Sequence, residues 1–287
     1  MPPFRVAVLD DYQNVALKYG DYASLSSMGC SVDVFNDNVD DWELSWPGNS
    51  YEPDDWSISP ALISRLQGYD CICAMRERSR FSRPTLAALK DAGLKLLITT
   101  GPGNAAIDME AAAKLGIAVA GTGYSEEGGS ATAELTWGLI LSVARRIPQE
   151  HAATMAPGGS FQTTVGLGLR GKTIGIVGLG KLGKEVACVA KAFGMRCVAW
   201  STNLTQATCD EVGGVALVSK EELFRTADII SVHLRASQRT VKTVGFVEFA
   251  WMKPTAILIN TSRGPIVDEL SLVEALAILL RRKGSRP

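Results

Sequence analysis

Three glycines with a fixed spacing give the clearest indication of chemistry in this chain. Gly178, Gly180 and Gly183 form a G-x-G-x-x-G run between an apolar stretch and an amphipathic one. The first glycine permits a tight turn, the second lets the backbone approach a pyrophosphate, and the third lets a helix pack closely on a strand. Such a run also occurs as an ordinary turn, but the strand and helix expected on either side favour a dinucleotide site. The loop is completed by Leu179, Lys181 and Leu182.

The residues after the next expected strand bear on which dinucleotide the site takes. NAD sites commonly carry an acidic residue about 20 positions beyond the glycines, bonded to the ribose hydroxyls. Here Ser201 follows Trp200, and no Asp or Glu lies between Arg196 and Thr208. Nor does an arginine follow the strand closely, as the 2′-phosphate of NADP would favour. We expect Ser201 to lie beside the ribose and NAD to be the cofactor, with NADP left open.

An arginine follows a later apolar run, in the sequence N-T-S-R-G. The planar guanidinium of Arg263 suits the carboxylate of a 2-oxo acid, which it can bind through two N–H groups. A fixed cation also stabilises the alkoxide that forms when hydride reaches a carbonyl carbon. Parallel sheets bind ligands at the carboxyl ends of their strands, which is where this arginine is expected. The alternative is that Arg263 only stabilises the turn from strand to helix.

Metal ligands and acid–base residues are scarce. The two histidines, His151 and His233, lie far apart and have no ligand-like spacing to the cysteines. Cys71 and Cys73 are two residues apart in an apolar run, so they point to one face of a strand and are expected to be buried free thiols. We therefore expect no metal site.

Length, composition and charge narrow the class of protein. A chain of 287 residues with 46% hydrophobic residues can bury a sizeable core and is expected to form two domains. The formal charge of −1 offers no positive field for a nucleic acid or an anionic membrane. The start of the chain has no signal-peptide pattern, and no apolar run approaches membrane-spanning length. We expect a soluble, cytoplasmic protein that binds small molecules, with no nucleic-acid or membrane partner.

Short apolar runs alternate with helical patterns along the chain, which predicts an α/β fold with parallel sheets. The expected strands are Phe4–Leu9, Ser31–Phe35, Tyr69–Met75, Leu94–Thr100 and Ile117–Ala120, then Thr173–Val177, Arg196–Trp200, Ile229–Val232 and Ala256–Asn260. The expected helices are Pro84–Ala92, Met109–Leu115, Ala131–Arg146, Gly183–Phe193, Lys220–Arg225 and Val247–Trp251. In the long helix 131–146, Leu135, Leu139, Ile140 and Val143 form one apolar stripe, and Pro148 ends the helix. Glycine-rich joints near 121–130 and 156–171 are the candidate boundaries.

Several longer stretches resemble one enzyme family. They are A-M-R-E-R-S-R-F, T-T-G-P-G-N-A-A-I-D, A-E-L-T-W-G-L-I-L and M-K-P-T-A-I-L-I-N-T-S-R-G-P-I-V-D-E. Together they resemble the D-isomer-specific 2-hydroxyacid dehydrogenases, over about Tyr69 to Glu274. The resemblance implies two doubly wound parallel-sheet domains. Residues 1–124 would be a flavodoxin-like substrate domain lacking its C-terminal return helix, and residues 125–287 a Rossmann NAD(P)-binding domain incomplete at its C-terminus.

The resemblance also implies roles for individual residues. Arg263 matches the arginine that holds the substrate carboxylate and polarises the keto oxygen. A loop whose backbone amides receive the same carboxylate matches Gly101, Pro102, Gly103 and Asn104. Arg76 matches a substrate-facing loop, although as an exposed charge it is equally expected to be merely solvated. The nicotinamide side would be lined by Asn260, Thr261 and Ser262.

In the family, a glutamate and a histidine beyond the arginine motif supply the proton, and neither is found after Glu274. His233 is interpreted instead as a cofactor-side or structural residue, and the chain as one cut short before its acid–base pair. We expect an NAD(P)-dependent oxidoreductase that interconverts a small 2-oxo acid and a 2-hydroxy acid, as a homodimer. The alternative is a non-catalytic module that binds the dinucleotide.

Overall fold

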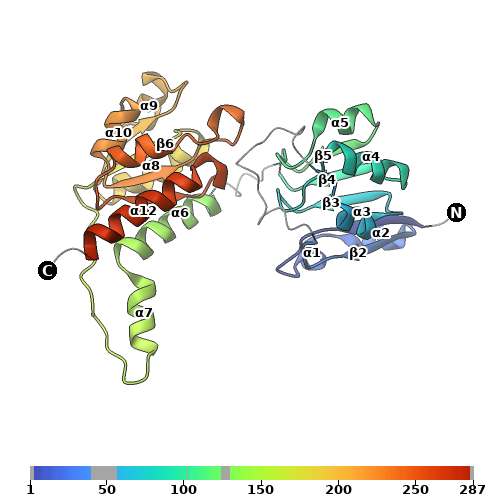
Figure 1. The fold of residues 1–287 in the computed structure, drawn as a ribbon, viewed down its shortest axis with the longest axis horizontal. Helices are drawn as coiled ribbons and strands as arrows, with labels where there is room; N and C mark the ends of the chain where they lie inside the picture. Colours follow the sequence, from blue (N-terminus) through green and yellow to red (C-terminus); the bar gives the residue numbers. More distant parts are fainter. Residues whose placement is uncertain (1–2, 40–56, 102, 124–129, 285–287) are drawn as a thin grey trace. The chain divides into compact units, whose positions relative to one another are not determined.

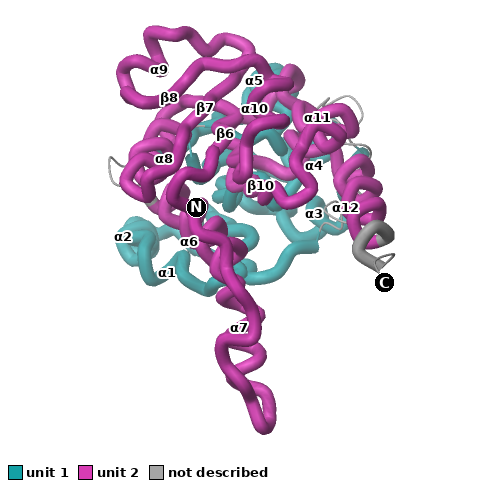
Figure 2. The backbone as a smooth tube through the Cα atoms, turned by 90° about the vertical axis from the view of Figure 1, so that its left-hand side faces the viewer, with its two compact units in different colours: residues 1–124 teal, residues 125–287 magenta. Residues whose placement is uncertain are grey.

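The computed structural model describes residues 3–39, 57–101, 103–123 and 130–284. Within it, nothing is described of the side chains of residue 130 and residues 281–284. The chain divides into two compact units, Met1–Tyr124 (unit 1) and Ser125–Pro287 (unit 2), which Figure 2 shows in different colours.

Unit 1 is built on a five-stranded parallel sheet with the order β2-β1-β3-β4-β5, the order of flavodoxin-like folds (Figure 1). Its strands are β1 (Phe4–Val8), β2 (Cys30–Val34), β3 (Cys71–Ala74), β4 (Leu96–Thr99) and β5 (Ala118–Gly121). Its helices are α1 (Ala16–Tyr19), α2 (Tyr22–Ser27), α3 (Pro60–Leu66), α4 (Arg83–Asp91) and α5 (Met109–Lys114). The chain reverses its direction across the sheet after β2. Because crossovers between parallel strands are right-handed, helices before and after that reversal lie on opposite faces.

The main core of unit 1 lies under α3, α4 and α5. Alternate strand residues such as Ala7, Ile72 and Leu97 point into it and are buried together with Leu62 and Leu86 from the helices. On the opposite strand faces, Cys71 is buried and Cys73 half-buried, and both are free thiols. The expectation of free thiols is confirmed, although only Cys71 is fully buried.

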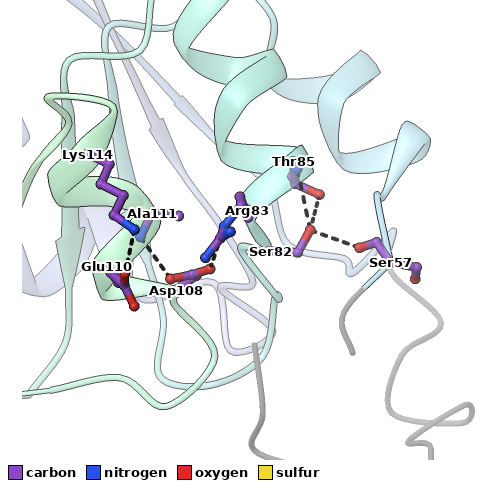
Figure 3. A network of polar contacts seen from close by, with 8 residues as sticks. All are labelled: Ser57, Ser82, Arg83, Thr85, Asp108, Glu110, Ala111 and Lys114. Atoms are coloured by element: carbon purple, nitrogen blue, oxygen red, sulfur yellow. Dashed lines mark hydrogen bonds and ion pairs between the residues drawn. The ribbon is translucent and has the colours of Figure 1, made fainter. Parts of the chain in front are cut away.

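Side-chain caps fix where α4 and α5 begin (Figure 3). The hydroxyl of Ser82 accepts a hydrogen bond from the Thr85 N–H at 3.3 Å, and Pro84 suits the first turn that follows. Asp108 caps α5 in the same way, with its carboxylate accepting from the Ala111 N–H at 2.8 Å. Each cap contributes about 1 kcal/mol to stability. The two helices thus begin at positions set by local sequence.

Unit 2 also contains a five-stranded parallel sheet, ordered β8-β7-β6-β9-β10 from one edge to the other. Its strands are β6 (Thr173–Val177), β7 (Arg196–Trp200), β8 (Val215–Leu217), β9 (Ile229–Val232) and β10 (Ile257–Asn260). Its helices are α6 (Ser130–Ala144), α7 (Ile147–Met155), α8 (Lys181–Ala192), α9 (Gln206–Val212), α10 (Lys220–Thr226), α11 (Phe246–Trp251) and α12 (Glu269–Gly284), with single 3₁₀ turns η4 (Gln238–Thr240) and η5 (Gly264–Ile266). Numbered within the unit, the order is 3-2-1-4-5, as in dinucleotide-binding Rossmann folds. The expected α/β class with two parallel sheets is confirmed.

The unit 2 sheet is covered on both faces. Ile174 and Ile176 of β6 pack against α6 and α8, whereas Val177 packs against Leu223 and Phe224 of α10. All five residues of β6 are buried, and after Thr173 the strand is apolar, as expected for a central parallel strand. A Cβ on Gly175 would lie 2.6 Å from Leu223 Cδ2, so a glycine there lets α10 approach the sheet. None of the helices described in either unit is both long and apolar enough to cross a membrane.

The apolar stripe expected on the long helix is only partly buried. In α6 the core residues are Ala133, Trp137, Ile140 and Ala144. Leu135, Leu139 and Val143 are instead 57%, 39% and 50% exposed. Of the predicted stripe, only Ile140 belongs to the core. The helix has two apolar faces, and periodicity alone cannot tell which one meets the core.

Three short elements of unit 2, besides its 3₁₀ turns, were not expected from the sequence, nor were α1, α2 and α3 of unit 1. Pro148 begins α7 rather than only ending α6, because Arg146 turns left-handed (φ +55°) and a proline suits the first turn of a helix. His151 therefore lies in a helix and not in a linker. The other two elements are α9 and β8. The helix α9 has one buried residue and the strand β8 has three residues, too few to show a helical or a strand periodicity.

Candidate functional site

The glycine turn follows β6 directly, and its packing depends on two of the three glycines. Gly178 has a φ of +102°, a left-handed conformation that L side chains rarely adopt. Its N–H donates to the carbonyl oxygen of Trp200 at 2.9 Å, which ties the turn to β7. A Cβ on Gly183 would clash with the carbonyl oxygen of Gly178, so α8 packs this close to the turn only because Gly183 has no side chain.

Gly180 differs, because the protein leaves open space beside it. A Cβ on Gly180 would meet no atom within 4 Å. Gly180 is also the N-cap of α8, and it offers no side-chain hydrogen bond to the first turn of the helix. The N–H groups of that turn lie at an uncapped, uncrowded helix end, which stabilises an anion. These features fit the pyrophosphate of a dinucleotide. Around them, Leu179 is buried, Leu182 half-buried and Lys181 exposed.

Ser201 lies beside the glycine turn, at the end of the neighbouring strand. Trp200 is the register partner of Val177, so the residues that follow them, Ser201 and Gly178, are neighbours. The nearby Lys220, whose Nζ lies 5.2 Å from the centre of the Trp200 ring, forms an ion pair with Glu248 at 2.6 Å. The residue that follows β7 thus offers a neutral hydroxyl, and the carboxylate of Glu248 is paired with Lys220.

The arginine motif forms a closed turn after β10. Asn260 ends the strand, and its side-chain amide donates to the Arg263 carbonyl oxygen at 2.9 Å and accepts from the Ser262 N–H at 3.0 Å. The Ser262 hydroxyl donates in turn to the carbonyl oxygen of Leu234, which joins this turn to the segment after β9. The Arg263 side chain is exposed, and its Nη1 lies 3.1 Å from the Ser262 carbonyl oxygen. The amide of Asn260 thus stabilises the turn that presents Arg263.

A second hydroxyl contact joins the motif to the long helix. The Thr261 and Thr136 hydroxyl oxygens are 2.8 Å apart, and Thr136 is fully buried in α6. Sequence reasoning did not identify Thr136 as part of the site. The available signal was a polar residue within an otherwise apolar helix segment, which needs a hydrogen-bond partner when it is buried.

His233 follows β9, on the other side of the glycine turn from Ser201. Its N–H donates to the Val177 carbonyl oxygen at 2.8 Å, and a Cβ on Gly178 would lie 3.0 Å from the His233 backbone. The ring Nε2 and the Ser231 hydroxyl are 2.8 Å apart. Burial lowers the pKa of His233 from 6.5 to about 4, so the ring is neutral near neutral pH.

In unit 1, hydrogen bonds join the loop after β4 to the segments that follow β5 and β3. Gly101 has a φ of +95°, and its N–H donates to the Thr122 hydroxyl at 2.6 Å. Asn104 is buried, and its side-chain amide donates to the Arg76 carbonyl oxygen at 2.5 Å. Gly103 is exposed, and in the described part of the chain no hydrogen bond involves its N–H. Pro102 lies outside the described residues. Sequence reasoning missed Thr122, which shares no motif with Gly101.

The expected site residues thus gather at one edge of each sheet. In unit 2 the expected residues follow four adjacent strands. The glycine turn follows β6, Ser201 follows β7, His233 follows β9, and the turn at 260–263 follows β10. In unit 1 Arg76 and Gly101 follow the neighbouring strands β3 and β4. Ligands of open parallel sheets bind at such carboxyl edges. Among the described residues, no group of three His, Cys, Asp or Glu side chains is arranged to hold a metal ion.

Comparisons with known proteins agree with this arrangement. A family model described as the NAD-binding domain of D-isomer-specific 2-hydroxyacid dehydrogenases matches residues 137–278. The chain is 43% identical to a glyoxylate reductase of Aeropyrum pernix over 178 residues, which are 59% of this chain and 52% of that protein. It is 33% identical to a D-3-phosphoglycerate dehydrogenase of Methanocaldococcus jannaschii over 215 residues, 75% of this chain and 40% of that protein.

The similarity extends to solved structures. A phosphoglycerate oxidoreductase from Vibrio cholerae superposes with a TM-score of 0.81 and 31% identity, over 96% of this chain and 81% of that one. The chain spans about half the length, or less, of the two curated relatives.

The different surroundings of two glycines lead to a prediction about cofactor binding. Gly180→Val places a side chain in open space at the helix end, so NADH affinity should fall at least about tenfold while the melting temperature stays close to that of the wild type. In Gly183→Val the new side chain clashes with the Gly178 carbonyl oxygen, so both the NADH affinity and the melting temperature should fall. NADH fluorescence titration and calorimetry of both variants provide the measurements. A Gly180 variant that binds NADH normally would contradict the pyrophosphate site.

The half-buried, desolvated imidazole of His233 leads to a prediction about pH. The folded-state pKa of about 4 lies below the ordinary 6.5, so the unfolded chain binds the proton more readily. The contribution of His233 to the free energy of unfolding is fully present above pH 6.5. It decreases as the pH falls toward 4, by up to about 3 kcal/mol. Denaturant unfolding of wild type and His233→Asn over this range should show the wild type losing more stability. Parallel pH profiles would contradict a neutral, desolvated His233.

Proposed function

Because the chain belongs to the D-isomer-specific 2-hydroxyacid dehydrogenase family, we propose that it interconverts a small 2-oxo acid and the corresponding 2-hydroxy acid with a nicotinamide dinucleotide. The observation that carries the proposal is the closed turn that presents Arg263. This turn lies on the same sheet edge as a glycine turn whose open helix end fits a pyrophosphate. Unit 1 would be the substrate domain and unit 2 the cofactor domain.

The residues of this chain would bind the substrate and stabilise charge. The bound nicotinamide supplies or accepts the hydride, and the proton of the 2-hydroxyl group is exchanged with solvent. The guanidinium of Arg263 would bind the substrate carboxylate through two N–H groups and stabilise the negative charge that develops on the keto oxygen. The backbone N–H groups of Gly103 and Asn104 would be further hydrogen-bond donors to the carboxylate. The neutral ring of His233 would have no acid role, and would instead help to shape the cofactor side of the turn.

We propose NAD as the cofactor, with NADP accepted less well. The Ser201 hydroxyl beside the glycine turn can bond to a ribose hydroxyl. Ser201 carries no charge that would repel a 2′-phosphate, but Lys220, which lies near Trp200, is paired with Glu248. The site therefore offers little to reject NADP and little to attract it.

The proposal is tested by following NADH and NADPH oxidation with glyoxylate, hydroxypyruvate and pyruvate. Arg263→Ala should lower kcat/KM roughly 100-fold, and Arg263→Lys should restore only part of it, because an ammonium group cannot form the two parallel bonds. NADH affinity should be unchanged in both variants. Binding of NADH without turnover of any 2-oxo acid would instead support the non-catalytic dinucleotide module.

We further propose that the protein is a homodimer whose subunits meet through unit 2. The exposed apolar face of α6 carries Leu135, Leu139 and Val143. Figure 2 shows α7 and the segment after it projecting away from the rest of unit 2. This arm exposes Met155, Phe161 and Val165. A monomer seldom exposes so many neighbouring apolar side chains, and a second copy of the same face would cover them.

The arm itself is held in a defined shape. The Glu150 carboxylate accepts hydrogen bonds from the backbone N–H groups and hydroxyls of both Thr163 and Thr164, at 2.5–3.1 Å. These bonds, above all the one from the Thr164 hydroxyl, lower the pKa of Glu150 to about 2. A pre-formed arm loses less entropy on association than a disordered one, which supports its role in the dimer.

The double substitution Leu135→Glu, Leu139→Glu should convert the dimer into monomers, because it would place four like charges across a two-fold interface. Sedimentation velocity measures the change. Leu270→Glu is the matched control, since Leu270 is also exposed, at 79%, but lies on α12. A wild type that sediments as a monomer, or a double variant that remains dimeric, would contradict this interface.

A further inference from the structure

Arg76 has a backbone conformation that arginine disfavours. Its φ is +59°, in the left-handed region where glycine is the usual residue. Arg76 lies in the segment that follows β3, at the carboxyl edge of the unit 1 sheet. Since the residue type opposes this conformation, contacts with the surrounding structure must maintain it.

Two hydrogen bonds from the segment around the end of β4 hold this backbone. The Arg76 N–H donates to the Thr100 hydroxyl at 2.9 Å. The Arg76 carbonyl oxygen accepts from the side-chain amide of Asn104 at 2.5 Å. Because β3 and β4 are neighbours in the sheet, the two bonds join adjacent loops at the same edge. Both polar groups of the Arg76 backbone are therefore bonded.

The side chain of Asn104 is fully used by the protein. It is 8% exposed, and its amide nitrogen also donates to the Thr99 hydroxyl at 3.0 Å. Its amide oxygen accepts from the Ala106 N–H at 2.8 Å. Only an amide provides both the donors and the acceptor that this set requires. Asn104 therefore acts on the Arg76 backbone, and its side chain is not available to a ligand.

The arginine held in this way has an exposed guanidinium. In the parts of unit 1 that the structure describes, the Arg76 side chain forms no ion pair or hydrogen bond. Arg78, two residues later, is different. Its Nη1 donates to the Asp10 carbonyl oxygen at 2.5 Å, and its guanidinium lies 4.3 Å from the centre of the Tyr12 ring. The strained backbone thus belongs to the arginine that is free to bind an anion.

We infer that Asn104 is a positioning residue, which holds Arg76 left-handed so that its guanidinium is presented to the anionic substrate. The inference rests on the proposed function, because the anion is taken to be the 2-oxo acid. It assigns Asn104 a role through its buried side chain, distinct from the role of the backbone amides in its loop. Removal of the Asn104 side chain should therefore weaken substrate binding by no more than removal of the Arg76 side chain does.

A double-mutant cycle on the full chain tests this dependence. The probe is oxamate, a non-reducible 2-oxo acid analogue, titrated calorimetrically into protein saturated with NADH. Asn104→Ala and Arg76→Ala should each raise the oxamate Kd, and the KM for glyoxylate, about tenfold. The double variant should be no worse than Arg76→Ala alone, because Asn104 then has no side chain to position. The NADH Kd should not change.

Further variants separate positioning from general destabilisation. Ser82→Ala removes the cap of α4 in the same unit (Figure 3), and should lower the melting temperature without changing the oxamate Kd. If Asn104→Ala does not fold, Thr100→Val removes the other bond to Arg76 at an exposed position and should raise the oxamate Kd in the same non-additive way.

The outcomes distinguish the inference from the proposed function. If the effects of Asn104→Ala and Arg76→Ala multiply, Asn104 acts independently of Arg76, and the inference is overturned while the function stands. The same holds if Asn104→Ala and Thr100→Val both bind oxamate as the wild type does. A wild type that binds NADH but neither binds oxamate nor reduces a 2-oxo acid would overturn the proposed function and the inference together.

Discussion

The close approach of α8 to the end of β6 is the constraint on which unit 2 depends. It requires a glycine at 183, because a side chain would clash with the Gly178 carbonyl oxygen. It also requires Gly178 to turn left-handed while its own N–H donates to Trp200 of β7 and the preceding Val177 carbonyl oxygen accepts from His233, which follows β9. Once this turn is formed, the uncapped helix end, Ser201 and His233 come together on three adjacent strands. The pyrophosphate site is thus a consequence of how a helix packs on a sheet.

Side-chain amides hold an arginine-bearing segment in both units. Asn260 bonds to the Arg263 carbonyl oxygen, and Asn104 to that of Arg76. An amide suits this role because it donates and accepts at once, and so closes a turn from one position. A carboxylate would lack the donor, and an alkyl side chain would lack both groups. The two arginines differ in their backbone, since only Arg76 is left-handed.

Burial gives two polar groups of unit 2 properties that their residue types do not have in water. It keeps His233 neutral, so this histidine can shape the cofactor side of the turn without carrying charge. It makes the Thr136 hydroxyl a bonded contact of Thr261, so the long helix helps to fix the arginine motif. Leu135, Leu139 and Val143 of the same helix stay exposed. One helix thus contributes both to the candidate site and to the proposed subunit contact.

The sequence by itself determined the α/β class, the central strands of unit 2 and the glycine turn, because alternation of apolar runs and the spacing of glycines are local properties. It did not determine which apolar face of α6 is buried, since both faces have helical spacing and only the neighbouring sheet selects one. It missed α7 and β8, whose short patterns carry little periodic signal. Contacts such as Gly101 with Thr122 and Thr136 with Thr261 were decided only by the tertiary structure, because hydrogen-bond partners distant in sequence leave no spacing to read.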